Sequence, residues 1–201
     1  MRTPLRYQVS EYDCGPTTFL NAVSFLFDIK EIQPDVIKAI YTYSLDGFNG
    51  KGEVGKTGTS GPCICFLSQW FNQYSKQRKF PIHCEYLNGS DVNLDNESKI
   101  ITVLKNGGCA LLKCYLDVGH YILATGYDEE KDMIKVFDPY YLHKALRRKD
   151  IHMVHDKPFA CNRYISVHRL SKENRDYYNL GPIDWRESVT FVRTDGKYVE
   201  P

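Results

Sequence analysis

The chain has 201 residues, and its 26 Lys and Arg nearly balance its 25 Asp and Glu, for a formal net charge of +1. Apolar residues make up 42% and charged residues 25%, the usage of an ordinary globular protein, which excludes a disordered or collagen-like chain. The balanced charge predicts no nucleic-acid partner and no anionic membrane partner, and no apolar run approaches the roughly 18 residues of a membrane span.

The first half of the chain is predicted to be mainly helical. The most apolar helix is expected over residues 16–29, where Pro16 suits the first turn and apolar side chains cover most of the circumference, so this helix belongs inside the protein. The Gly-rich residues 46–61 predict a long exposed loop that forms a lid or a wall of a substrate cleft. Further helices are predicted over residues 34–43, 62–77 and 96–105, after an irregular or extended segment at 1–13.

The second half of the chain is predicted to form an antiparallel sheet. The short polar connection at 128–132 predicts a hairpin. Helices followed by strands favour an α+β fold, and the length suits a single domain over residues 1–201. Strands are expected over residues 109–116, 120–127, 133–138, 161–170 and 188–194.

The chain contains seven cysteines, an odd number, and its start lacks the apolar stretch of a signal peptide. We therefore expect reduced thiols and a cytoplasmic location. Neither Cys63 with Cys65 nor His152 with His155 has a matching second pair at zinc-binding spacing, so we expect no metal and no cofactor. Most of the cysteines are expected to be small buried hydrophobic residues.

One cysteine differs from the others because it lies where a helix begins. Cys14 directly precedes Gly15 and Pro16 at the start of the predicted buried helix. The unpaired N–H groups and the dipole at a helix N-terminus favour a thiolate over a thiol, and Gly15 leaves room for a substrate. A buried structural cysteine is the alternative, but the sequence around Cys14 favours a nucleophile.

Three further residues complete a set suited to nucleophilic catalysis. The pair Gly119-His120 opens an apolar strand, and a nucleophilic thiol needs such a base nearby. If the following hairpin pivots about Glu129, Asp138 lies directly opposite His120, where its carboxylate can orient the imidazole. Gln8 carries an amide that suits an oxyanion hole. Taken one at a time, these residues also fit a core histidine, a turn initiator and a solvated glutamine.

Together these residues resemble a known family. Gln8 followed by Asp13-Cys14-Gly15-Pro16, and later the segment GHYILATGYDEEKDMIKVFDPY, are similar to the motifs of the papain-like peptidases that cleave bacteriocin leaders after a double glycine. The resemblance covers about residues 5–140 and leaves 141–201 as an unmatched extension of the same domain. It implies a papain-like fold, in which a central helix carrying the cysteine packs on an antiparallel sheet.

The resemblance also implies roles for individual residues. Cys14 would attack the substrate, His120 would be the base, Asp138 would orient it and Gln8 would stabilise the oxyanion. The segment Gly58-Thr59-Ser60 is similar to one wall of that family's cleft. We therefore expect Gly58, Thr59 and Gly119 to contact a peptide or protein substrate.

Several alternatives stay open at this stage. The bacteriocin-processing members usually carry a transporter and an ATP-binding domain, which this chain lacks, so stand-alone relatives are the better comparison. Transfer of the acyl group to an amine uses the same residues as hydrolysis, and a catalytically silent peptide-binding module would keep the same fold. The sequence does not decide the oligomeric state. Because Cys14 lies so near Met1, we expect no long inhibitory segment before it, and any restraint would come from residues 46–61 or the C-terminal part.

Residues 50–57 (GKGEVGKT) formally match the phosphate-binding loop G-x-x-x-x-G-K-[ST]. That motif requires a buried strand directly before it and a helix directly after it. The preceding residues end in turn formers, and Thr57 is followed by GTSGP. Nucleotide binding is therefore the less favoured hypothesis.

Overall fold

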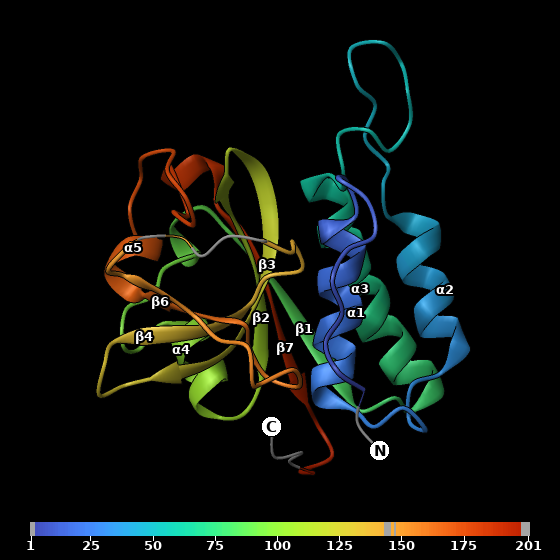
Figure 1. Ribbon diagram of the computed structural model, residues 1–201. Helices are drawn as coiled ribbons and strands as arrows, with labels where there is room; N and C mark the ends of the chain where they lie inside the picture. Colours follow the sequence, from blue (N-terminus) through green and yellow to red (C-terminus); the bar gives the residue numbers. More distant parts are fainter. Residues whose placement is uncertain (1–2, 143–145, 147, 198–201) are drawn as a thin grey trace.

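The computed structural model describes residues 3–142, 146 and 148–197, and Figure 1 shows its layered architecture. A layer of three helices covers one face of an antiparallel sheet, and two shorter helices pack on the other face. The helices are α1 (Cys14–Leu26), α2 (Pro34–Tyr43), α3 (Gly61–Arg78), α4 (Lys99–Lys105) and α5 (Val167–Leu170). The strands are β1 (Ile82–Asn88), β2 (Cys109–Leu116), β3 (Val118–Asp128), β4 (Met133–Phe137), β5 (Ile151–Met153), β6 (Arg163–Ser166) and β7 (Glu187–Arg193). The predicted α+β class is confirmed.

The strands of the described residues form one sheet in the order β1-β7-β2-β3-β4-β6-β5. Each neighbouring pair is antiparallel. The last strand in the chain, β7, lies between β1 and β2, where Phe191 pairs with Cys84 on one side and with Cys109 on the other. The C-terminal part of the chain therefore joins β1 to the rest of the sheet.

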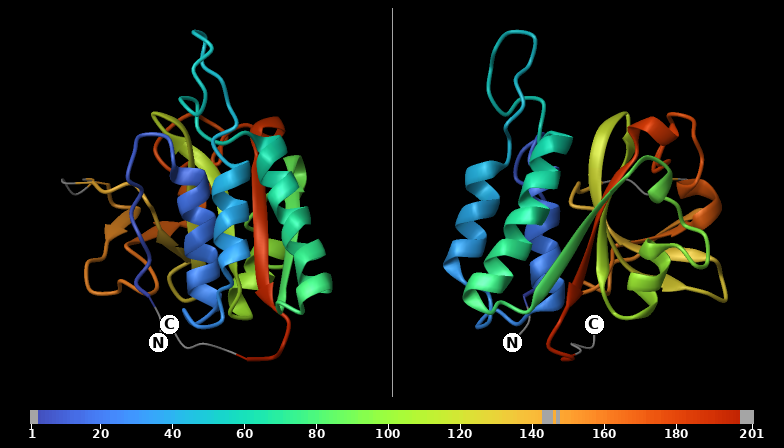
Figure 2. Two further views of the ribbon diagram at one scale, coloured as in Figure 1. Left: turned by 90° about the vertical axis from the view of Figure 1, so that its right-hand side faces the viewer. Right: turned by 180° about the vertical axis from the view of Figure 1, so that it is seen from behind.

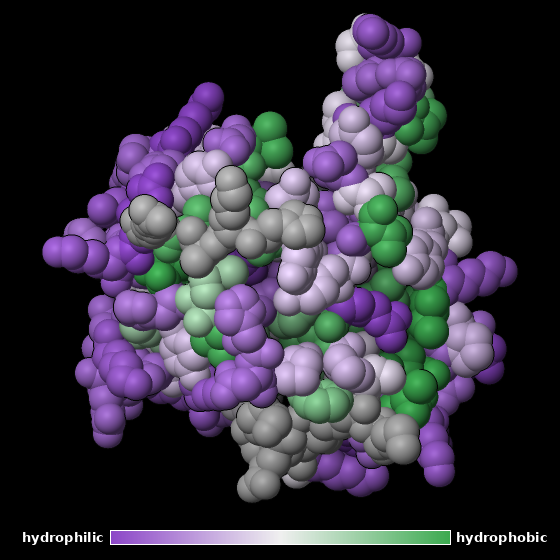
Figure 3. Space-filling model, viewed as in Figure 1, coloured by the Kyte–Doolittle hydropathy of each residue, from purple (hydrophilic) through white to green (hydrophobic). Residues whose placement is uncertain are grey.

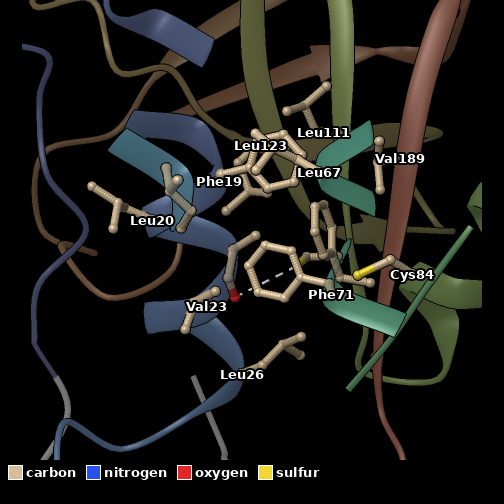
Figure 4. Packing of buried hydrophobic residues seen from close by; sticks show 14 of the residues in the cluster. Phe19, Leu20, Val23, Leu26, Leu67, Phe71, Cys84, Leu111, Leu123 and Val189 are labelled. Carbon is tan, nitrogen blue, oxygen red and sulfur yellow. Dashed lines mark hydrogen bonds between the residues drawn. The ribbon is translucent and has the colours of Figure 1, made fainter. Parts of the chain in front are cut away.

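Two apolar cores lie on the two faces of the sheet, which explains why its central strands are apolar at nearly every position. In β2, Leu111 faces the core under α1 and α3, whereas its neighbour Leu112 faces the core under α4. Figure 4 shows the first core, in which the ring of Phe19 from α1 stacks on Phe71 from α3 at 5.9 Å between ring centroids. Every residue of α1 is buried, as its apolar circumference predicts.

Two strands and one short helix were not foreseen in the sequence. The alternating exposure of β1, with His83 exposed between buried Ile82 and Cys84, arises because only one face of this edge strand packs under α3 at these positions. The single strand predicted over 161–170 ends early because the Ser166 hydroxyl accepts a hydrogen bond from the Arg169 N–H and begins α5. The other unforeseen strand, β5, pairs only with β6 at the opposite edge.

The Gly-rich segment between α2 and α3 projects beyond the helical layer (Figure 2). Phe48 pairs with Val54 in an isolated antiparallel bridge, and the Asn49 side chain accepts hydrogen bonds from the backbone N–H groups of Lys51 and Glu53. The surface of this projection is largely hydrophilic (Figure 3). No strand precedes residues 50–57, and α3 begins only at Gly61, so the context of a phosphate-binding loop is absent from this described segment.

None of the helices in the described part of the chain has the length and apolar character that a membrane crossing requires.

Candidate active site

Cys14 is the first residue of α1, the most deeply buried helix of the molecule, and its own side chain is 7% exposed. The residue before it organises the approach of the chain. The carboxylate of Asp13 accepts hydrogen bonds from the backbone N–H groups of Val9 and Ser10, and from the hydroxyl groups of Ser10 and Thr17. Burial alone would raise the pKa of Asp13, but these hydrogen bonds hold it below its usual value. An ionised Asp13 thus folds residues 9–13 back against the start of α1.

Gly15 allows a second segment to approach the start of α1. A Cβ atom at position 15 would lie 2.7 Å from Oγ1 and 2.8 Å from Cβ of Thr59, closer than van der Waals contact permits. Gly58 has a φ of +79°, a conformation that favours glycine. Thr59 therefore packs against the start of α1 where Gly15 has no side chain, and the predicted cleft-wall residues Gly58 and Thr59 line the same cleft as Cys14.

His120 lies on β3, paired with Cys114 of β2, and is 5% exposed. Of the histidines in the described residues it alone is buried, while His143 lies outside them. Its Nε2 lies 2.8 Å from Oδ1 of Asp138. Because an ionised carboxylate only accepts, Nε2 donates, which leaves Nδ1 as the ring nitrogen available to the thiol.

Two opposing effects act on the pKa of His120. Burial alone would lower the pKa of His120, but the charge and hydrogen bond of Asp138, together with a hydrogen bond to Cys14, raise it above its usual value. Burial alone would raise the pKa of Asp138, but the charges of His120 and Arg163 hold it below its usual value. The arrangement therefore favours an imidazolium between the thiol and the carboxylate.

The pairing of His120 with Asp138 does not use the predicted register. The turn of the hairpin occupies four residues, 129–132, and the register shifts at a β-bulge between Ala124 and Gly126. Leu123 therefore pairs with Phe137, and Asp138 lies just beyond the end of β4, offset from His120 along the neighbouring strand. The prediction that the two residues lie directly opposite was wrong. The side chains still meet because diagonal neighbours on adjacent strands remain within reach.

Three residues that the sequence analysis missed hold Asp138 in place. Asn162 clamps its backbone, accepting from the Asp138 N–H at 2.8 Å and donating to the Asp138 carbonyl at 2.8 Å. The hydroxyl of Tyr178 donates to Oδ2 at 2.5 Å, and the Arg163 guanidinium lies 3.2 Å from the same oxygen. Little in the sequence signalled them, because Asn162 and Arg163 lie in a predicted strand that also contains the polar residues Ser166, His168 and Arg169.

Gln8 lies beside the site through its backbone, since its N–H donates to the carbonyl of Pro139 at 2.9 Å. Its side-chain Nε2 donates to the carbonyl of Ser10, and its Oε1 is buried without a hydrogen-bond partner. The Gln8 amide is thus hydrogen-bonded within its own loop, to the residue two positions further along the chain. The second N–H of the same Nε2 group is the one left for its predicted part in an oxyanion hole.

A cleft of about 850 Å³ opens beside Cys14. The expected substrate-contact residues Gly58, Thr59 and Gly119 line it. Gly119 lies under the ring of Trp185, which stacks on Tyr115 with ring centroids 4.1 Å apart. Two lining residues are held by Glu187, which accepts a hydrogen bond from Tyr121 at 2.5 Å and pairs with Lys113 at 2.8 Å. Glu187 also accepts a hydrogen bond from Tyr86 at 3.1 Å.

The site can be compared with known families on this geometry. A model of the Peptidase_C39 like family matches residues 2–171, most of the chain. The chain belongs to the Peptidase_C39 like family. Membership makes it a relative of the papain-like cysteine peptidases and implies a peptide or protein substrate. No curated protein matches the chain.

The Peptidase_C39 like match extends further than the motifs that first indicated the family, and it includes β5, β6 and α5. It ends at Ser171, before Tyr178 and β7. Across the described residues, no three His, Cys, Asp or Glu side chains are grouped so as to hold a metal ion.

Proposed function

We propose that this protein is a thiol peptidase that hydrolyses a peptide or isopeptide bond through an acyl-enzyme on Cys14. His120 carries the proton, Asp138 orients and charges His120, and Gln8 with the backbone N–H of Cys14 stabilises the oxyanion. Gly58, Thr59 and Gly119 contact the substrate chain in the cleft.

The first half of the reaction forms a thioester. The Cys14 thiolate attacks the carbonyl carbon, a C–S bond forms, and the carbonyl π electrons move to the oxygen. As the oxyanion collapses, the C–N bond breaks and the leaving amine takes the proton from His120. Asp138 holds the ring so that Nδ1 faces this leaving group.

The second half regenerates the thiolate. Neutral His120 takes a proton from water as the water oxygen attacks the thioester carbon. The C–S bond then breaks, the carboxylic acid leaves, and Cys14 is again a thiolate beside a protonated His120. Attack by water distinguishes this hydrolysis from transfer of the acyl group to an amine.

The observation that carries the proposal is the buried His120 with one nitrogen committed to Asp138 and the other left for Cys14. A core histidine of purely structural use has no reason to be held as a cation next to a thiol at a helix start. Cys14 also lines an open cleft, so a substrate can reach it.

Alkylation by iodoacetamide at mildly acidic pH tests the proposal. Cys14 is expected to react well ahead of the other thiols because only it has an imidazolium partner. Burial raises the pKa of Cys84, Cys109, Cys114 and Cys161, and that of Cys63 to about 12. The remaining competitor is Cys65, which is partly exposed, so the comparison is made in wild type, Cys65→Ser and Cys14→Ala.

Turnover is followed by mass spectrometry on a peptide library, with and without added amines. Cys14→Ala is expected to abolish product while its thermal unfolding matches that of wild type. Equal labelling of all seven cysteines would contradict the proposal. Selective labelling with amide products only would make the protein an acyltransferase, and selective labelling with peptide binding but no product would make it a binding module.

A further inference from the structure

The two oxygens of the Asp138 carboxylate have separate partners. Oδ1 accepts from His120 Nε2 and, at 2.7 Å, from the backbone N–H of Tyr140. Oδ2 accepts from the hydroxyl of Tyr178 and lies against the guanidinium of Arg163. Asp138 and Tyr178 are fully buried and Arg163 is 1% exposed. Oδ1 therefore accepts from His120, whereas Oδ2 contacts the phenol of Tyr178 and the guanidinium of Arg163, which are both buried.

Arg163 is an unusual residue to bury here. Its Nη1 donates to the Asn162 side chain at 2.9 Å and its Nη2 to the Tyr140 carbonyl at 3.2 Å, but its Nε has no partner. Replacing a buried ion pair by well-packed apolar residues is often neutral or stabilising, so stability is a weak reason for this arginine. Among the described residues its counter-charge is Asp138, the carboxylate that faces His120.

Tyr178 reaches the same carboxylate from a strained backbone. Its φ is +64°, a conformation that is rare for a bulky side chain, and its N–H donates to the Tyr115 carbonyl at 2.7 Å. The ring lies under the Arg163 guanidinium, 5.6 Å from Cζ to the ring centroid. Tyr178 lies beyond the family match, which ends at residue 171.

We propose that Arg163 and Tyr178 are positioning residues of the reaction: Tyr178 fixes the orientation of the Asp138 carboxylate, and Arg163 balances its charge. This inference rests on the proposed peptidase function. With Arg163 and Asp138 paired, the thiolate of Cys14 and the imidazolium of His120 form a second neutral pair in the same buried cluster. Without Arg163, the same state would carry a net negative charge away from water, which is costly.

The other groups around this cluster do not supply the balancing charge. Burial raises the pKa of Cys114, Tyr121 and Tyr178, so these groups stay neutral. The charge of Glu187 on β7 is met by Lys113, and that of Asp13 by the N–H and hydroxyl groups around it. The Tyr140 ring lies edge-on to His120 at 6.3 Å between ring centroids.

The test measures the rate of Cys14 alkylation by iodoacetamide as a function of pH, in a Cys65→Ser background. Arg163→Met removes the positive charge and makes loss of a proton from the cluster less favourable. The acidic limb of the profile is therefore expected to move to higher pH by about one unit, which is a tenfold loss of alkylation rate at a given pH on that limb. Arg163→Lys keeps the charge but not the planar fork, and should lower the plateau with the limb in place. Tyr178→Phe should lower the plateau about tenfold.

The matched control is Arg169→Met. Arg169 is also a buried arginine, paired with Asp150 at 2.6 Å and Asp176 at 3.3 Å, but it does not touch Asp138. It should lower the unfolding temperature without moving the alkylation profile. If Arg163→Met behaves in the same way, with limb and plateau unmoved, the inference is overturned.

A further arm covers the case in which Arg163→Met does not fold. Arg163→Lys and Tyr178→Phe retain most of the packing, and a wild-type plateau in both would overturn the inference. Failure of the proposed function is distinguishable because it is read from the wild-type protein alone: either Cys14 shows no selective alkylation, or Cys14 is labelled selectively and no hydrolysed peptide forms.

Discussion

The protonation states of the candidate site depend on a chain of single side chains. Asp138 keeps its charge because a histidine, an arginine and a tyrosine face it, and that charge in turn keeps a proton on His120. The folded pKa of His120 is raised, so its imidazolium persists to higher pH than in an exposed histidine. The thiol of Cys14 thus has a cationic neighbour through the neutral range.

Asp138→Asn is expected to remove this effect. Without the carboxylate, burial alone acts on His120 and lowers its pKa, so the imidazolium that accompanies the thiolate is lost and the rate of Cys14 alkylation in the neutral range should fall. Hydrolysis should fall by roughly 10²- to 10⁴-fold, the range for loss of an acid–base contribution. The measurement is the pH dependence of alkylation, with turnover measured on the same samples.

The control for this variant is Asp95→Asn, which makes the same chemical change at an exposed position. It should leave both profiles as in wild type. An Asp138→Asn protein whose Cys14 is alkylated at the wild-type rate across the neutral range would show that the carboxylate does not control the proton on His120.

At the scale of elements, the helices were easier to predict than the contacts between them. The helix at 34–43 and the strand at 109–116 match α2 and β2 residue for residue, because capping, periodicity and turns are local signals. The contact between His120 and Asp138 was predicted, but with the wrong strand register. The bulge at Thr125 and the four-residue turn that set the register leave no clear mark in the sequence. Arg163 and Tyr178 meet Asp138 through the pairing of β6 with β4 and through a loop, which no local pattern records.

The contact between α1 and the loop before α3 supplies a second prediction. Gly15→Ala places a methyl group against Thr59 and should push the 57–60 wall away from Cys14. We expect a loss of about 1–3 kcal/mol in the free energy of unfolding, typical of overpacking, and slower alkylation of Cys14. Denaturant unfolding and the iodoacetamide rate measure the two effects.

Thr59→Gly in the Gly15→Ala background should restore the alkylation rate, because it removes the atoms that the new methyl group meets. Gly50→Ala is the matched control, since a methyl group at this position in the projecting loop would meet no atom within 4 Å. If Gly15→Ala matches Gly50→Ala in both measurements, the close approach of the loop does not shape the site.

At the scale of the molecule, the sheet joins the middle of the chain to its C-terminal part. Among the described strands, β1 pairs with β7 alone, and β7 comes from beyond the family match. The order of helices followed by strands predicted an α+β fold but gave no sign that the last strand enters between β1 and β2, because strand order is decided by packing across the whole chain. The part of the chain beyond the family match also places Tyr178 against Asp138 and Trp185 in the lining of the cleft.

Deletion of residues 171–201 is therefore expected to abolish folding. The truncated chain loses β7, separates β1 from β2 and exposes the core faces of both. The milder variant Phe191→Ala leaves the strand in place but removes a ring that packs edge-on against Phe19 at 5.4 Å, and should cost about 3–5 kcal/mol. Circular dichroism and denaturant unfolding of the two proteins measure these effects.

The sequence alone had left open that the C-terminal part restrains activity, in which case its removal would raise turnover. The paired strands argue the opposite, since a segment inside the sheet cannot leave without taking β1 with it. Val54→Ala, on the exposed tip of the projecting loop, is the matched small truncation and should leave unfolding unchanged. A deleted chain that still unfolds cooperatively and whose Cys14 still reacts selectively would mean that β7 completes a sheet that is already stable without it.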